Sequence, residues 1–343
     1  MKIIVDAFGG DNAPLAVLQG CEQAVKEYGV TILLTGDETK IKETAAKANI
    51  SLNQMEISHT DTVITMCDNP VEVVRSLKDC SMARGLKLLA EGQGDAFLSA
   101  GSTGAIVVGA SRIVKTIPGI KRAAIATVIP SFPGCFMLMD SGANKECRPE
   151  MLTQFGIMGS AYMNKILKVE KPRVALINNG AEESKGTALQ LEAYAQLKEA
   201  PVHFIGNVEG RDLPYGCCDV AVADGFTGNI VLKLYEGLGS AFSKEIKKIL
   251  YHSTLTKIGG LLVKKQFNAF KATMDYSEYG GAPLLGISKP VIKAHGSSNA
   301  KAFKNAIRQA RDCVENDVIG EIEESMAQLK AQENAAECEE NAQ

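Results

Sequence analysis

The sequence predicts an α/β fold, a three-layer α/β/α sandwich around a mainly parallel sheet. Short apolar runs rich in β-branched residues alternate along the chain with longer amphipathic runs, the pattern of strands followed by helices. Gly-rich polar turns follow several of the short runs, and in parallel sheets such turns gather where ligands bind. With 343 residues, 45% of them hydrophobic, the chain is long enough to bury a large core.

Each predicted strand is a short apolar run, and each predicted helix is longer, with apolar residues three or four positions apart. The expected strands are 3–5, 32–34, 96–98, 124–129, 136–139, 174–177 and 220–223. The expected helices are 15–28, 71–89, 105–114, 151–167, 187–197 and 229–250. We expect residues 1–331 to form one α/β domain or two lobes of one, and residues 332–343 to be an acidic flexible tail.

Composition narrows the class of protein. A net charge of −3 argues against a general nucleic-acid binder. The nine cysteines are odd in number and contain no CxxC pair, which favours a reducing cytosol. The first apolar run is too short for a secretion signal, and no segment approaches the roughly 18 apolar residues that span a bilayer. We expect a cytoplasmic protein, soluble or peripheral to a membrane.

Residues 99–105 form a candidate anion site between a strand and a helix. Gly101 and Gly104 allow backbone N–H groups to approach an oxyanion, Ser102 and Thr103 add hydroxyl donors, and a helix N-terminus adds partial positive charge. An ordinary solvent-facing turn would have a similar sequence. Four further turns place glycine beside small polar residues after an apolar strand: 6–11, 140–144, 178–186 and 224–229. We therefore expect one shared site.

The candidate substrate-binding residues come from these turns. They are Asp6, Gly9, Gly10, Asp11, Gly101, Ser102, Thr103, Gly104, Asn144, Glu182, Asp224, Thr227 and Gly228.

Three residues are candidates for catalysis: Lys185, Asn229 and His295. Lys185 precedes a helix start and could clamp an oxyanion, oriented by Glu182 or Glu183, although most lysines are simply solvated. His295 precedes a small-residue turn and could relay a proton or donate to phosphate, whereas a structural or capping imidazole would look the same.

Several common chemistries have no motif in the chain. It contains no Walker P-loop, no GxGxxG with a following acid, no HExxH and no GxSxG elbow. These absences argue against nucleotide hydrolysis, ordinary Rossmann dehydrogenation, zinc proteolysis and serine hydrolysis. The adjacent Cys217 and Cys218 have no flanking histidine and lead into a strand, so we expect small buried thiols.

A basic stretch at about 241–273 is predicted to be a helical hairpin. It carries seven Lys and one Glu between positions 244 and 271, and helix-like segments 242–250 and 261–270 flank Gly259-Gly260. An apolar tip ringed by lysine suits insertion among anionic headgroups, and packing against a second subunit is the alternative. The expected membrane contacts are Leu255, Ile258, Leu261, Leu262 and Val263.

Taken in order, the motifs resemble the bacterial acyl-carrier-protein:phosphate acyltransferases of phospholipid synthesis, the PlsX family. Two small departures are Phe8, where members often have Met, and 179–183, where Asn-Gly-Ala-Glu-Glu replaces Ile-Gly-Glu-Glu. The matching segments, which span nearly the whole chain, are 1–14, 99–105, 140–144, 224–229, 278–286 and 294–299.

The resemblance implies an isocitrate dehydrogenase-like fold and a homodimer. It also implies transfer of a fatty acyl group from acyl carrier protein to inorganic phosphate, giving an acyl phosphate for a membrane glycerol-3-phosphate acyltransferase. Phosphate is already an anionic nucleophile at neutral pH, so amide-rich turns suffice to position it, and no metal or organic cofactor is expected. The protein would be cytoplasmic and peripherally membrane-associated, without a nucleic-acid partner.

Three other functions remain to be compared with this one. A phosphate acetyltransferase-like enzyme would use acyl-CoA, which a comparison of donors distinguishes. A metal-dependent hydroxyacid dehydrogenase would need an Asp cluster and an Arg-rich clamp, and the sequence shows neither. A noncatalytic peripheral scaffold would leave the five Gly/polar turns unexplained.

Overall fold

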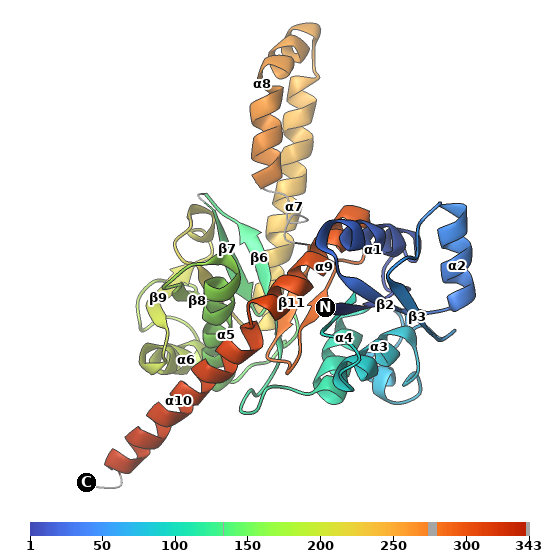
Figure 1. The fold of residues 1–343 in the computed structure, drawn as a ribbon. Coiled ribbons are helices and arrows are strands. Elements are labelled where there is room, and N and C mark those ends of the chain that lie inside the picture. Colours follow the sequence, from blue (N-terminus) through green and yellow to red (C-terminus); the bar gives the residue numbers. More distant parts are fainter. Residues whose placement is uncertain (133, 274–279, 341–343) are drawn as a thin grey trace.

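The computed structural model describes residues 1–132, 134–273 and 280–340. Two sheets with helices on their faces form the body of the protein, and a helical hairpin projects from it (Figure 1). Neighbouring strands are parallel except for the pairs β5–β11, β11–β12 and β6–β7. The predicted α/β class with mainly parallel strands is therefore confirmed.

The first sheet has seven strands in the order β3-β2-β1-β4-β12-β11-β5. Their bounds are β1 Lys2–Asp6, β2 Thr31–Gly36, β3 Met55–His59, β4 Ala96–Ser99, β5 Ala124–Ile125, β11 Ala282–Leu285 and β12 Val291–Lys293. Successive residues of β1 enter different cores: Ile3 and Val5 pack with α1 and α9, while Ile4 packs with α3 and α4. Burial on both faces makes this half of the protein three-layered.

The second sheet has five strands in the order β6-β7-β10-β8-β9. Their bounds are β6 Thr127–Pro130, β7 Cys135–Met139, β8 Arg173–Asn178, β9 His203–Glu209 and β10 Val220–Val222. In β10, Val220 and Val222 pack towards α5, while Ala221 lies in a separate core with Tyr235 of α7. Helices therefore cover both faces of this sheet as well.

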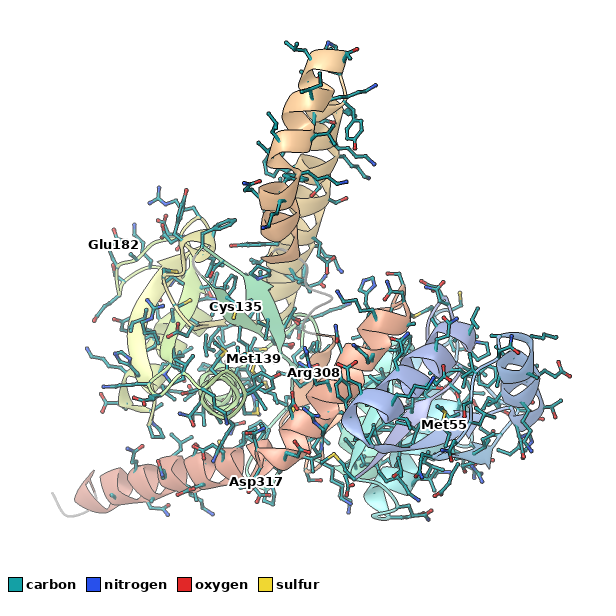
Figure 2. The ribbon with its side chains drawn as sticks, turned by 45° about the horizontal axis from the view of Figure 1, so that its top comes forward. Met55, Cys135, Met139, Glu182, Arg308 and Asp317 are labelled. Carbon is teal, nitrogen blue, oxygen red and sulfur yellow. The ribbon has the colours of Figure 1, made fainter. Side chains whose placement is uncertain are left out.

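Ten α-helices lie in the described ranges. They are α1 Leu15–Tyr28, α2 Glu38–Lys47, α3 Ser81–Ala90, α4 Thr103–Gly109, α5 Pro149–Leu167, α6 Ala188–Glu199, α7 Gly225–Leu250, α8 Thr254–Thr273, α9 Ala300–Glu315 and α10 Val318–Glu340. Short helical turns occupy Pro70–Val74, Ala110–Val114 and Leu213–Tyr215. Helix α9 packs on α1 and α10 on α5, so these two consecutive helices connect the two halves (Figures 1 and 2).

Several predicted elements differ from the structure. The single strand expected at 124–129 is two strands, because the chain leaves the first sheet at Ala126 and enters the second. The helix expected at 71–89 is two separate elements. A short helical turn, capped by Asn69, ends at Val74, and α3 begins only at Ser81. Strands β3, β9, β11 and β12 and helices α2 and α10 were not expected.

The hairpin consists of α7 and α8, and α7, with 26 residues, is about 39 Å long. The turn between the helices lies at 251–253, so the predicted break at Gly259-Gly260 is wrong: both glycines lie inside α8. Helix α10 continues to Glu340, so residues 332–340 of the expected tail are helical, and 341–343 lie outside the described residues.

Candidate functional site

A cavity of about 680 Å³ opens where turns from both sheets meet. Turns that follow β1, β4 and β12 contribute Asp11, Thr103 and residues 294–299. The second sheet contributes residues from 141–145, after β7, and from 225–236, after β10. Because the carboxyl ends of parallel strands meet here, the cavity lies where α/β proteins usually bind ligands.

The turns of the first sheet are held together by buried hydrogen bonds. Ser99 Oγ donates to Asp6 Oδ2 at 2.7 Å and accepts from the Gly101 amide at 3.0 Å, while burial raises the pKa of Asp6. A Cβ at Gly9 would lie 2.6 Å from Ser99 Oγ, so only glycine fits. These groups brace the loops, and from the two predicted turns only Asp11 and Thr103 line the cavity.

Other predicted residues of these turns lie next to the lining. Gly10 has a φ of +98° and packs against the Gly296 carbonyl oxygen, to which the Asp11 amide donates at 2.8 Å. Ser102 is buried before Thr103, and Gly104 packs against Pro70. The turn at 6–11 thus contacts the turn at 294–299 directly.

The turns of the second sheet hold the start of α7. The Asp140 carboxylate accepts from the amides of Gly142, Ala143 and Asn144 and from Asn144 Nδ2. Burial raises the pKa of Asp140. At Gly228 a Cβ would overlap the Asp140 carbonyl oxygen, which explains why α7 can approach this turn so closely.

Asp224 caps α7, accepting from the Phe226 and Thr227 amides and from Thr227 Oγ1. Four of the predicted residues therefore contact other protein groups: Asn144, Asp224, Thr227 and Gly228. Asn229, one turn into the helix, lines the cavity.

Positive charge is concentrated in the lining. Lys145, Lys233 and Lys293 line the cavity with His295, against the acids Asp11 and Glu236. Lys233 Nζ lies 2.7 Å from Glu236 Oε2. Burial, together with the nearby Lys233, lowers the pKa of Lys293 to about 8, so this lysine is still mainly charged at neutral pH.

These three lysines are not among the site residues predicted from the sequence. A signal existed for two of them: Lys233 lies one helical turn after Asn229, and Lys293 immediately precedes the motif that contains His295.

His295 lies on the turn between β12 and α9. Its Nδ1 is 2.8 Å from Ser297 Oγ, and burial lowers the pKa of the imidazole, which favours the neutral ring at pH 7. Asn299 caps α9 by accepting from the Ala302 amide at 3.0 Å, and both residues line the cavity. The N-terminal ends of α7 and α9 therefore face the same space. The first amides of α7 donate to the Asn144 carbonyl oxygen and to Asp224, so of the two it is the N-terminus of α9 that favours an anion.

The fifth predicted turn, 178–186, lies elsewhere. Asn178 Nδ2 donates to the Lys185 carbonyl oxygen at 3.0 Å, and Asn207 Nδ2 donates to that of Glu182 at 2.9 Å. Neither Lys185 nor Glu182 lines the cavity of its own chain, and Figure 2 places Glu182 at the outer edge of the half built on the second sheet. Four of the five predicted turns converge, and Lys185 is separate from them.

The hairpin exposes its apolar residues. Leu255 is 82% exposed and Leu262 78%, and Ile258, Leu261 and Val263 are exposed on the same helix. No helix in the described ranges combines the length and apolarity needed to cross a bilayer. Among the side chains that the structure describes, no three His, Cys, Asp or Glu residues cluster as metal ligands.

The fold and the cavity together define an α/β protein with a cationic pocket at the carboxyl ends of its strands. The model of the family described as "Fatty acid synthesis protein" matches residues 1–321. The chain belongs to this family.

Curated relatives agree with that membership, and a solved structure shares the fold. Two proteins named "Phosphate acyltransferase" are similar over 96% of this chain and 98% of their own: 47% identical in Alkaliphilus oremlandii (strain OhILAs) and 48% in Clostridium botulinum (strain Langeland / NCTC 10281 / Type F). The structure of the EutD phosphotransacetylase from Staphylococcus aureus has the same fold, with a TM-score of 0.61 at 20% identity, over 91% of this chain and 94% of that one.

Proposed function

We propose that the protein transfers a fatty acyl group from the thioester of acyl carrier protein to inorganic phosphate. The observation that carries this proposal is the cavity, in which three lysines, one histidine and the N-terminus of α9 face one space. Phosphate is the anion that such a site favours, and the curated relatives are named for acyl transfer to phosphate. The product is an acyl phosphate for a membrane glycerol-3-phosphate acyltransferase.

Phosphate binding comes first in the mechanism. Lys293 and the N-terminus of α9 offer charge and amide donors on one side, and Lys145 and Lys233 offer charge from the other sheet. Holding the nucleophile beside the thioester supplies much of the rate enhancement, because the reaction becomes effectively unimolecular.

A phosphate oxygen then attacks the thioester carbonyl carbon, forming a C–O bond and a tetrahedral oxyanion. Asn229 Nδ2 and the cavity lysines are the donors available to stabilise that charge. Collapse breaks the C–S bond and releases the thiolate of the carrier.

Neutral His295 accepts the proton that phosphate loses and returns it to the leaving thiolate. No residue changes its net protonation over the cycle. Lys185 would have to act from outside the cavity of its own chain, and its clamp role remains a prediction.

The test is mass-spectrometric detection of acyl phosphate from acyl carrier protein and phosphate. We expect Asn229→Ala to lower kcat by about a hundredfold, as loss of an oxyanion donor does. Lys185→Ala tests the predicted clamp role of Lys185: loss of product in this variant supports the role, and full retention of product formation removes it. An acyl-CoA donor assayed in parallel separates this function from acyl transfer to or from coenzyme A. Absence of acyl phosphate when acyl carrier protein is the donor would overturn the proposal.

Two surfaces of the hairpin suit two partners. The tip, which here means the turn at 251–253 together with the first turns of α8 that carry Leu255 and Leu262, is apolar and close to basic residues such as Lys257, which favours contact with an anionic membrane surface. Along the side of α7, every fourth residue is apolar and between 46% and 63% exposed; this apolar face consists of Phe226, Ile230, Leu234, Leu238 and Phe242. Such a ridge fits the groove of a second helix, and we assign it to a homodimer.

The proposed location is cytoplasmic, with peripheral membrane attachment through the tip. Lys145 and Lys233 are exposed at the cavity and suit an acidic carrier protein as it delivers its thioester.

A further inference from the structure

The adjacent Cys217 and Cys218 lie outside the cavity, in the turn that precedes β10. Their sulfur atoms are 3.9 Å apart, and both thiols are free. Cys217 is partly exposed, whereas Cys218 is 1% exposed and packs with Tyr235 of α7 in the core beneath the second sheet. The expectation of small buried thiols therefore holds for Cys218, and Cys217 is open to reagents.

Cys217 is also the more reactive of the two. Its hydrogen bond with Cys218 lowers the pKa of the Cys217 thiol to about 7, against burial, which raises it. More of Cys217 than of an ordinary cysteine is therefore thiolate near neutral pH, and the thiolate is the form that attacks soft electrophiles. Burial and the same contact raise the pKa of Cys218.

The backbone around the pair is held firmly. Arg173 Nη1 donates to the Cys217 carbonyl oxygen at 3.1 Å and Nη2 to that of Gly216 at 3.0 Å. The Asp219 carboxylate in turn accepts from Arg173 Nε and Nη2. The carbonyl oxygen of the peptide group between the two cysteines thus accepts a hydrogen bond from a charged side chain. This bond opposes rotation of the peptide group.

That restraint disfavours a direct disulfide and favours a bridging atom. Neighbouring Cα atoms across a trans peptide are about 3.8 Å apart, whereas disulfides usually need about 4.4–6.8 Å between Cα atoms and about 2.05 Å between sulfurs. In a disulfide the two sulfurs are bonded to each other, whereas an atom bonded to both sulfurs keeps them further apart. Binding such an atom therefore requires a smaller change in the sulfur–sulfur distance of 3.9 Å than forming a disulfide does.

We infer that Cys217 and Cys218 form a two-thiol binding site for a trivalent arsenical. With phenylarsonous acid, the hydrated form of phenylarsine oxide, two As–OH bonds break and two As–S bonds form. Two molecules of water are released, taking up the two thiol protons, and arsenic stays trivalent, so no oxidant or reductant is required. The site is independent of the proposed acyl transfer.

The experiment uses phenylarsine oxide and the full chain. Intact-mass spectrometry in excess monothiol should show one arsenical per chain, and a dithiol such as 2,3-dimercaptopropanol should remove it, because only a bidentate adduct resists a monothiol. Cys217→Ser and Cys218→Ser should each lower retention at least tenfold. Cys67→Ser, at an exposed single cysteine, is the matched control and should retain the adduct.

A second measurement needs no variant and so does not depend on whether the serine proteins fold. Trypsin cleavage after Arg211 and Lys233 gives one peptide that contains these two cysteines and no other. The arsenical should be on that peptide. An adduct on another peptide, or one that excess monothiol strips from the wild-type protein, would overturn the inference.

Discussion

His295 is the residue whose protonation the proposed mechanism uses most directly. Because burial lowers its pKa, the imidazole remains neutral to a lower pH than an ordinary histidine would. A rate that needs the neutral ring should stay constant around pH 7 and decline only as pH falls through that lowered pKa. At the alkaline end, Lys293 loses its charge above a pKa of about 8, which should weaken phosphate binding.

We predict that His295→Gln lowers kcat by about a hundredfold, the usual range for general acid–base catalysis, and removes the acid limb of the pH profile. The measurement is acyl phosphate formation between pH 5 and 9. His203→Gln is a control on β9, away from the lining. An unchanged profile in His295→Gln would assign the ring a structural role through Ser297.

Among the secondary-structure elements, the hairpin tip offers the clearest surface to alter. Leu262→Asp and Leu255→Asp put charge on side chains that are 78% and 82% exposed, so the fold should tolerate them. Each should shift the protein to the supernatant when it is sedimented with anionic vesicles, while activity on soluble substrates stays unchanged. Unaltered sedimentation of both variants would refute the membrane assignment of the tip.

The apolar face of α7 makes a different prediction. Leu234→Glu and Leu238→Glu replace exposed residues of that face that do not line the cavity. Burying the glutamate charge in a helix–helix contact costs free energy, because the charge loses its hydration. Sedimentation equilibrium should therefore show self-association that is at least tenfold weaker. Measuring vesicle binding per protomer distinguishes a loss of self-association at this face from a loss of membrane binding at the tip. A dimer of undiminished stability would place the subunit contact elsewhere.

At the scale of the molecule, the close approach of α7 to the Asp140 turn connects the hairpin to the second sheet. Gly228→Ala should lower the free energy of unfolding by about 1–3 kcal/mol or more, because its Cβ would overlap the Asp140 carbonyl oxygen. Gly237→Ala is a matched control on the same helix, where a Cβ meets no atom within 4 Å, and it should raise stability by about 0.5–1 kcal/mol. Denaturant unfolding measures both; equal effects would contradict this packing.

The amount that could be predicted differs between elements. Helix α1 has the predicted bounds, and β1, β2, β4, β7, β8 and β10 match predicted runs to within two residues, because each buries a local apolar pattern. The division of 124–129 between two sheets was not predictable, since Ala126 looks like any strand residue until its partners are known. Strand β11 was not predicted for a similar reason: residues 282–285 are recognised as a strand only by their pairing with β5 and β12.

For the site, the type of chemistry was predictable from residue types alone: glycine-bearing turns with small donors follow the strands, and such residues suit an oxyanion. Which turns share a space became known only from the folded chain, in which Asp11, Thr103, Asn229 and His295 lie with three lysines and Lys185 lies apart. The two kinds of information differ in how far along the chain the interactions reach. Turn chemistry and strand periodicity depend on neighbours within a few residues, whereas the cavity depends on contacts between segments such as 6–11 and 294–299, nearly 300 residues apart.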